Sequence, residues 1–397
     1  MKAWVWLITA LLFSLQWIGF RLFGIHLAPQ WEVLGAGMAI FGAAFILSWA
    51  AEAAQVDIPQ ALALAFLALV AVLPEYAVDI YFAWSAGKDP TYIAYATANM
   101  TGANRLLIGV GWASVVLTYY LKTGNKKIQL ESSHISEIRY LGLATIYSFI
   151  IPLKGRLDIV DAIVFIAIFL LYMRAASKAE HVETELEGPP AMIEGWGEGA
   201  RRLFTVLFFL YSGFTIYIAA EPFAEGLLAT GRTFGIEEFI LVQWLAPLAS
   251  ESPEFIVAIL FALKLQPGIS MGALLSSKVN QWTLLIGMLP VVFMISGGSM
   301  APMVMDQRQI EEMFLTAAQS LFAVAILANL SISLLEAAVI FLLFSTQLLF
   351  PDPQFRFYYS FLYIFLAIGL VVVKKDVRAG VLALFSRGSP AGIMEKH

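Results

Sequence analysis

The sequence contains no cysteine, and charged residues make up only 13% of its 397 positions. Without cysteine the chain forms no disulfide, no thiolate metal site and no thiol nucleophile. Hydrophobic residues reach 60%, whereas soluble domains carry roughly 45–50% apolar and about 25% charged residues. The mean hydropathy is +0.80. This composition excludes soluble, disordered and nucleic-acid-binding proteins and indicates an integral membrane protein that crosses the bilayer several times.

Apolar stretches of about 20 residues are long enough to cross the hydrocarbon core as helices. Such stretches occur at residues 3–22, 31–51, 59–85, 91–121, 136–152, 156–176, 202–230, 236–264, 268–296, 309–328, 330–350 and 355–374. They predict an all-α polytopic membrane protein with about 12 transmembrane helices. The first stretch is too long and too rich in Trp and Phe for a cleaved signal peptide, so we expect it to remain as an anchor.

The basic residues in the loops predict the orientation of the chain. An even number of spans places both termini on one side, and Lys and Arg collect on the cytoplasmic side of membrane proteins. Of the 24 basic residues, 15 lie on the side of the termini, 7 lie on the other side, and Arg105 and Lys278 fall inside predicted spans. We therefore expect cytoplasmic termini in the cell (plasma) membrane.

A short motif occurs twice in the chain. PEYAVDIYFA at 74–83 and PEFIVAILFA at 253–262 are identical at six of ten positions, and LLIG follows each copy, at 106–109 and 284–287. Because the chain crosses the membrane five times between the copies, they enter from opposite sides. Inverted repeats of this kind are typical of secondary transporters, whose substrate site lies at the midplane between the repeats.

Proline and glycine interrupt both copies of the motif, at Pro74, Gly102, Pro253 and Gly272. In transporters, such interruptions are typical of broken helices whose free carbonyl groups face an ion. We therefore expect broken helices and exposed carbonyl oxygens at these four positions.

The repeat predicts a ten-helix core with one extra helix at each end. The expected parts are an extra N-terminal helix within 1–30, a first half at 31–176 with its repeat at about 65–115, an acidic cytoplasmic linker at 177–201, a second half at 202–350 with its repeat at about 243–293, and an extra C-terminal helix with a basic cytoplasmic tail at 351–397.

Four carboxylates lie at membrane depth within the repeats, where ionisable residues are costly and indicate function. Glu75 and Glu254 follow the proline of each copy, and Asp79 lies one helical turn after Glu75. Glu251 precedes Glu254 by three residues. The expected cation ligands are Glu75, Asp79, Glu251 and Glu254 with the neutral oxygens of Ser250, Ser277, Asn99 and Gln281. Hard cations such as Ca²⁺, Mg²⁺ and Na⁺ prefer oxygen ligands, and a buried carboxylate can also carry a proton.

Two basic residues stand against these four carboxylates. Arg105 and Lys278 are candidates for counter-ions, and Lys278 is also a candidate for a built-in cation that replaces a transported one. With both basic residues charged, the site would carry a charge of −2, which one divalent cation would neutralise. A structural role, as ion pairs with Glu75 and Glu254, is the alternative.

The doubled Pro-Glu motif in inverted repeats resembles the α-repeats of the calcium/cation antiporter superfamily, in particular its sodium/calcium exchanger branch. The family pattern is Gly-Thr-Ser-Leu-Pro-Glu, followed downstream by Gly-Ser-Asn. The resemblance implies that Glu75 and Glu254 are the main ligands of a transported Ca²⁺. It also places Ser277 at the family's serine, Gln281 at a later acidic or amide position, and either Ala98 or Asn99 at the serine of the first copy.

The sequence departs from the family pattern at the positions that bind Na⁺. Ala71 and Val72 replace hydroxyl residues before the first Pro-Glu pair, and Lys278 replaces the asparagine of Gly-Ser-Asn. The resemblance implies secondary active sodium/calcium exchange by alternating access. The departures keep a proton-coupled exchanger of Ca²⁺ or another cation open, and a non-transporting cation sensor is the alternative of another class.

Enzymatic activity is not expected from this sequence. It contains no HExxH motif and no phosphate-binding glycine loop, and its four histidines lie outside the predicted spans. We expect no cofactor and no nucleic-acid partner. The expected partners are the lipid bilayer and inorganic cations, namely transported Ca²⁺, Na⁺ or H⁺.

The substitution Glu254→Gln tests the predicted role of the second repeat. Because the amide keeps the shape but removes the negative charge, we expect this variant to lose cation transport in a flux assay with reconstituted protein. Normal flux in the variant would contradict the assignment of Glu254 as a main ligand.

Overall fold

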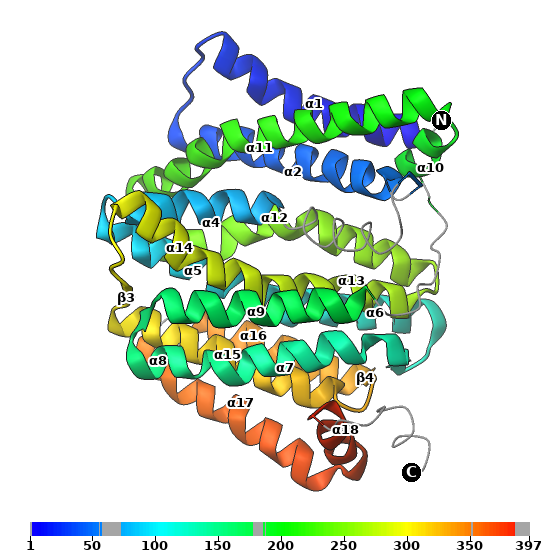
Figure 1. Ribbon diagram of the computed structural model, residues 1–397, viewed down its shortest axis with the longest axis vertical. Helices are drawn as coiled ribbons and strands as arrows, with labels where there is room; N and C mark the ends of the chain where they lie inside the picture. Colours follow the sequence, from blue (N-terminus) through cyan, green and yellow to red (C-terminus); the bar gives the residue numbers. More distant parts are fainter. Residues whose placement is uncertain are drawn as a thin grey trace.

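The computed structural model describes residues 2–54, 56–57, 73–177, 186, 188–350 and 352–385. Within these ranges, nine helices are long and apolar enough to cross a membrane, and Leu334–Leu349 forms a shorter apolar helix. The helices run side by side in stacked layers (Figure 1). The prediction of an all-α polytopic membrane protein is therefore confirmed. The first part of the predicted span 59–85 lies outside the described residues, as do most of 177–187 and the C-terminal tail.

The first half of the chain contains α1 (Lys2–Leu22), α2 (Pro29–Ala54), α4 (Leu73–Ala86), α5 (Ile93–Leu106), α6 (Ala113–Thr123), α7 (Ile135–Ser148), α8 (Ile150–Lys154) and α9 (Ile159–Ala176). The second half contains α10 (Pro189–Glu194), α11 (Glu198–Phe234), α12 (Glu238–Leu263), α13 (Pro267–Asn280), α14 (Ile286–Gly297), α15 (Gln307–Leu327), α16 (Leu334–Leu349), α17 (Pro353–Val373) and α18 (Lys375–Phe385). Helices α1 and α18 belong to opposite outer layers of the stack, but the start of α1 and the helix α18 both lie on the right in Figure 1.

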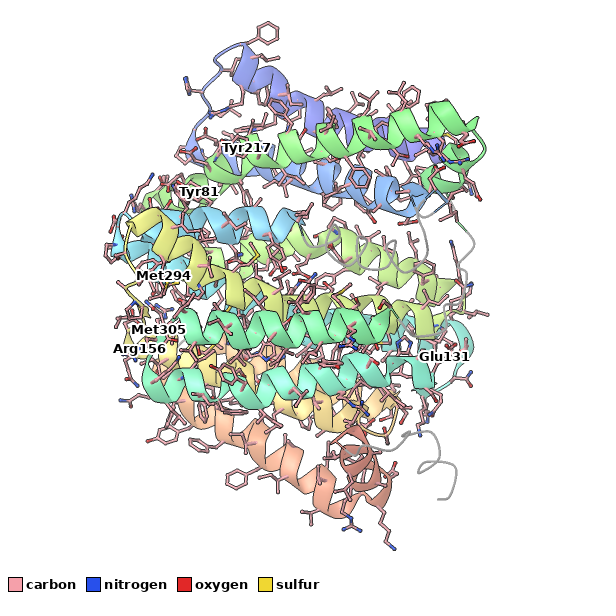
Figure 2. All side chains as sticks on the ribbon, viewed as in Figure 1. Tyr81, Glu131, Arg156, Tyr217, Met294 and Met305 are labelled. Atoms are coloured by element: carbon pink, nitrogen blue, oxygen red, sulfur yellow. The ribbon has the colours of Figure 1, made fainter. Side chains whose placement is uncertain are left out.

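Two small sheets join loops from different halves of the chain. Strand β1 (Lys127–Gln129) pairs with β4 (Ser331–Ser333), and β2 (Arg156–Leu157) pairs with β3 (Met303–Val304), both antiparallel. Glu131, just after β1, and Arg156, in β2, mark the two ends of the bundle (Figure 2). Each sheet takes one loop from each half, so the inverted repeat relates one sheet to the other.

The starts of α9 and α16 also follow the repeat. Asp158 and Asp161 form a capping box at the start of α9, and Ser333 and Glu336 form one at the start of α16. A capping box satisfies backbone N–H groups that have no partner in the first turn. The two helices occupy corresponding places in the two halves, and the same local device begins both of them.

The helix α1 packs beside α2 and α11 in the layer at one end of the stack (Figure 1). The Ser14 hydroxyl lies 2.6 Å from the Tyr211 hydroxyl of α11. Near the start of α11, Arg201 donates to Asp57 over 2.7 and 2.8 Å, and these bonds lower the pKa of Asp57 to about 2. Helix α17 packs on α15 at the opposite end of the stack, where the rings of Phe314 and Phe357 lie 5.5 Å apart.

The expected breaks at Gly102, Pro253 and Gly272 are wrong, because α5, α12 and α13 run through these residues without interruption. Proline removes only one backbone donor, which a helix held by its neighbours tolerates. The glycines allow close contacts instead. A Cβ atom on Gly102 would lie 1.8 Å from the Gln243 carbonyl oxygen, and one on Gly272 would lie 2.4 Å from the His134 ring. Pro74 lies at the start of the described part of its helix.

The irregular backbone lies further along each repeat, in two π-helical segments. They cover Leu107–Trp112, between α5 and α6, and Gln281–Leu285, between α13 and α14. Aligned on the repeated LLIG motif, Leu107 corresponds to Leu285, so the first segment begins at the position where the second one ends. Single π turns inside α-helices are frequent at functional sites.

The crossing of α5 and α12 predicts the effect of the substitution Gly102→Ala. The added methyl group would collide with the backbone of α12. We therefore expect the free energy of unfolding to fall by about 1–3 kcal/mol or more. A lower thermal midpoint in detergent would measure this loss. Gly213→Ala in α11 is the matched control, because nothing lies within 4 Å of the place that its new methyl group would take. Equal midpoints for the two variants would contradict this account of the crossing.

Candidate cation site

The two repeats meet where α4 and α5 approach α12 and α13. Glu75 is the third residue of α4, and Glu251 lies in the middle of α12; each is 2% exposed. The two carboxyl groups lie within hydrogen-bonding reach of each other. Neither oxygen of Glu75 has a donor among the described residues. Two carboxylates in this arrangement repel unless a proton or a cation lies between them.

Asp79 and Glu254 complete the group of four carboxylates. Asp79 is fully buried one turn after Glu75, and its carboxylate faces the side-chain amide of Asn99. Glu254 is half-buried and interacts electrostatically with Glu75 and Glu251. The structure therefore brings together all four carboxylates that the sequence singles out.

Neutral polar side chains of α12, α13 and the π-helical segment Gln281–Leu285 lie near these carboxylates. The Gln281 side chain donates to the Glu251 carboxylate and lies 3.4 Å from the Ser277 hydroxyl. The Ser250 hydroxyl donates to the backbone carbonyl groups of Ala246 and Pro247, over 3.2 and 3.4 Å. The lone pairs of this hydroxyl stay available for a cation.

Tyr76 links the repeats at the level of the site, a contact that the sequence pattern does not predict. Its hydroxyl donates to the side-chain oxygen of Asn280 over 2.6 Å, and both side chains are buried. Phe255 takes the place of Tyr76 in the second copy of the motif, so the hydroxyl group belongs to the first copy alone. The difference between Tyr76 and Phe255 is the one feature of the sequence that could have indicated this contact.

Lys278 lies fully buried on α13 beside the carboxylates. Its ammonium group donates to the side-chain oxygen of Asn104 over 2.7 Å and to the Asn104 carbonyl over 3.2 Å, and it lies 4.4 Å from the centre of the Trp282 ring. It also interacts electrostatically with Glu251 and Glu75. Lys278, from the second repeat, therefore binds a helix of the first repeat and places its positive charge beside the candidate ligands Glu251 and Glu75.

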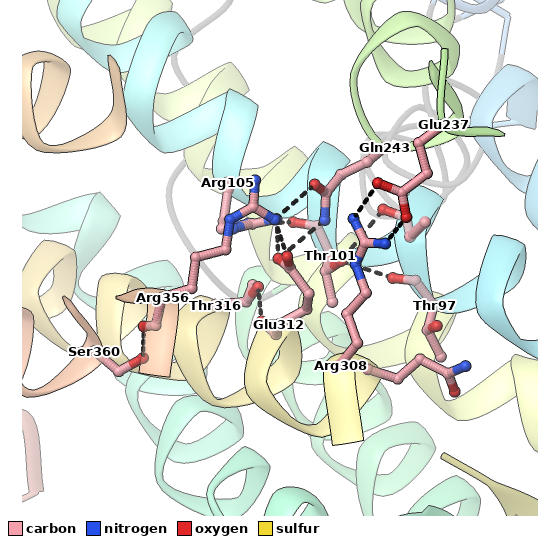
Figure 3. A network of polar contacts seen from close by, with 12 residues as sticks. Thr97, Thr101, Arg105, Glu237, Gln243, Arg308, Glu312, Thr316, Arg356 and Ser360 are labelled. Atoms are coloured by element: carbon pink, nitrogen blue, oxygen red, sulfur yellow. Dashed lines mark hydrogen bonds and ion pairs between the residues drawn. The ribbon is translucent and has the colours of Figure 1, made fainter. Parts of the chain in front are cut away.

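Arg105 differs from our expectation of a counter-ion for the site carboxylates. It pairs with Glu312 of α15 over 2.5 Å, and its guanidinium group lies 4.9 Å from the centre of the Trp244 ring. Arg356 of α17 binds the other oxygen of the same carboxylate. Figure 3 shows these groups converging between the helices. Sequence patterns gave no signal for Glu312 and Arg356, because both lie near the ends of predicted spans, where charged residues are common.

The expected charge balance of the site changes with this placement. With Arg105 assigned to Glu312, Lys278 is the basic residue that remains beside the four carboxylates. Among the described residues, no three Asp, Glu or His side chains are placed to hold a metal ion. The ligand set expected around Glu75 and Glu254 is therefore not assembled as a closed metal cage in this arrangement.

A family model described as sodium/calcium exchanger protein matches the chain over residues 30–178 and 204–351. A structure described as the H⁺/Ca²⁺ exchanger CAX is 45% identical, with a TM-score of 0.93 and complete coverage of both chains. YfkE is 16% identical with a TM-score of 0.59, and the match covers 94% of this chain and 100% of that one. The sodium-calcium exchanger NCX_Mj is 13% identical with a TM-score of 0.55, covering 81% and 98%. Among curated proteins, none matches the chain.

The contact between Glu75 and Glu251 predicts the effect of Glu251→Gln on cation binding. The amide removes one of two facing negative charges, so we expect Ca²⁺ affinity to fall at least about tenfold, which corresponds to about 1.4 kcal/mol. Equilibrium binding of ⁴⁵Ca²⁺ to purified protein measures this change. Glu221→Gln, on the exposed side of α11, is the control that should bind normally. Unchanged affinity in Glu251→Gln would remove this residue from the site.

Proposed function

The chain belongs to the sodium/calcium exchanger family, and from this premise we propose that it is a secondary active antiporter that exchanges Ca²⁺ for protons. The observation that carries the proposal is the pair of buried carboxylates, Glu75 and Glu251, which face each other from the two repeats. A proton or a cation between them relieves the same repulsion. The two species therefore compete for one site, and this competition is what couples their movements.

The four carboxylates and their neutral neighbours supply the oxygen ligands that Ca²⁺ prefers. We propose Glu75 and Glu254 as the main Ca²⁺ ligands, with Asp79 and Glu251 beside them. The neutral ligands would come from Ser250, Ser277, Asn99 and Gln281. Transport by alternating access requires that the site open to one side at a time, and its place between inverted repeats suits that mechanism.

Two observations favour protons over Na⁺ as the counter-ion. The ammonium group of Lys278 lies beside the carboxylates, where a positive charge opposes the binding of an additional Na⁺. In addition, the similar structure with 45% identity is described as an H⁺/Ca²⁺ exchanger. The sodium/calcium exchanger NCX_Mj shares only 13% of its residues with this chain, which supports the fold alone. Sodium coupling therefore stays a prediction from the sequence.

We further propose the division into two repeat halves at 31–176 and 202–350 and the placement of both termini in the cytoplasm. The ranges that match the family model support the division. The excess of basic residues in the loops on the side of the termini supports the orientation. The role of the protein would be transport rather than catalysis.

Uptake of ⁴⁵Ca²⁺ into proteoliposomes tests the coupling ion. We expect an imposed pH gradient to drive uptake and an imposed Na⁺ gradient to drive little, because Lys278 adds positive charge to the site. The Glu254→Gln variant is the control for leak. Uptake driven by Na⁺ alone would overturn proton coupling while keeping Ca²⁺ as the substrate. Absence of uptake under both gradients would overturn Ca²⁺.

The role of Lys278 is tested by Lys278→Asn, which restores the asparagine of the family pattern. Removing the positive charge should make Na⁺ a stronger competitor, so we expect Na⁺ to inhibit ⁴⁵Ca²⁺ binding at concentrations at least about tenfold lower than in the wild type. Lys278→Arg keeps the charge and is the matched control. Equal inhibition by Na⁺ in all three proteins would show that Lys278 does not exclude Na⁺.

A further inference from the structure

A second group of charged side chains lies buried outside the cation site (Figure 3). The Glu312 carboxylate accepts hydrogen bonds from Gln243 and Arg356 and forms an ion pair with Arg105. These side chains come from α5, α12, α15 and α17, and all are at most 1% exposed. Two guanidinium groups share one carboxylate, so the group carries one net positive charge.

This charge cannot be removed by titration. A buried lysine can lose its proton, but arginine keeps its charge in proteins. A charge at membrane depth is costly unless a partner compensates it. The Trp244 ring beside Arg105 compensates only part of that cost, because a cation–π contact is weaker than an ion pair. The group therefore calls for a negative partner.

Three donor atoms around Glu312 lack an acceptor within the part of the chain that the structure describes. They are Nη1 of Arg105, Nε of Arg356 and the hydroxyl of Tyr363, which is fully buried and interacts electrostatically with Arg105. Buried polar groups in folded proteins almost always have a hydrogen-bond partner, and a bound ion can serve as that partner. The free donors and the excess charge lie in the same place.

We propose that this group, Arg105, Arg356 and Tyr363 around Glu312, binds a small inorganic anion of halide size. A monovalent anion would cancel the net charge and accept hydrogen bonds from the free donors. Because these side chains are at most 1% exposed, the proposed site suits a small anion rather than an organic phosphate. This site is distinct from the cation site, and the proposal does not depend on the transported ion.

The site carboxylates are the alternative source of compensation. Arg105 directly follows Asn104, which binds Lys278 of the cation site. Helix α5 therefore contacts both the group around Glu312 and the cation site. The charged residues that act most strongly on Arg105 are nevertheless Glu312 and Arg356, and not the cation-site carboxylates. If those carboxylates balanced the excess positive charge, halide ions would not change the thermal stability of the protein.

Thermal unfolding of the full-length protein in detergent, without Ca²⁺, tests the proposal. Potassium chloride replaces potassium gluconate stepwise at constant ionic strength and constant potassium concentration. A bound anion raises the midpoint, and above the dissociation constant the stabilisation grows with the logarithm of anion concentration. We expect this response in the wild type with chloride and with bromide. Identical midpoints in chloride and gluconate would overturn the proposal.

Two variants make the test specific. Arg356→Gln removes one guanidinium group and leaves Arg105 and Glu312 as a neutral pair. The apparent chloride affinity should then fall at least about tenfold, because a charged hydrogen-bond donor is lost. Arg201→Gln removes an ion-paired arginine at the Asp57 contact and should respond like the wild type. Wild-type chloride dependence in Arg356→Gln would contradict the site.

A direct measurement covers the case in which Arg356→Gln does not fold. Crystals of the wild-type protein grown in bromide should show an anomalous difference peak between the guanidinium groups of Arg105 and Arg356. A peak at this place would support the proposal independently of any variant. Well-ordered density for both arginines without such a peak would overturn it.

Discussion

The structure depends on one constraint, which is that a charge buried at membrane depth must be compensated inside the protein. Two groups of charged residues meet it differently. At the candidate cation site, Glu75 and Glu251 face each other with an excess of negative charge. Around Glu312, the excess is positive. The first excess suits exchangeable cations and protons, whereas the second involves arginines that keep their charge.

The same helices carry both groups, so the position of one constrains the other. Helix α5 holds Lys278 through Asn104 and reaches Glu312 through the next residue, Arg105. Helix α12 contributes Gln243 to one group and Glu251 to the other. The close crossing at Gly102 fixes these two helices against each other. In the proposed exchanger, a rigid contact of this kind would keep the cation ligands in place.

The backbone follows the inverted repeat more closely than the side chains do. The capping boxes of α9 and α16 and the two small sheets occur in corresponding places, and the two π-helical segments meet at one equivalent position. The polar residues do not correspond in the same way, since Lys278 has no basic counterpart in the first copy and Arg356 lies outside both copies. In the proposed exchanger, the symmetric backbone would allow opening to either side, and the asymmetric side chains would determine which ions are accepted.

The sequence by itself determined the membrane class, the helical spans and the four carboxylates that the structure brings together, because hydropathy and a repeated motif are properties of local sequence. It did not predict the continuity of α12 through Pro253, since neighbouring helices decide whether a proline breaks a helix. Only the tertiary structure decided which charges pair. Arg105 binds Glu312 rather than a site carboxylate, and Lys278 binds Asn104. Periodicity shows which face of a helix a residue occupies, whereas the partner on that face depends on the packing of segments far apart in the chain.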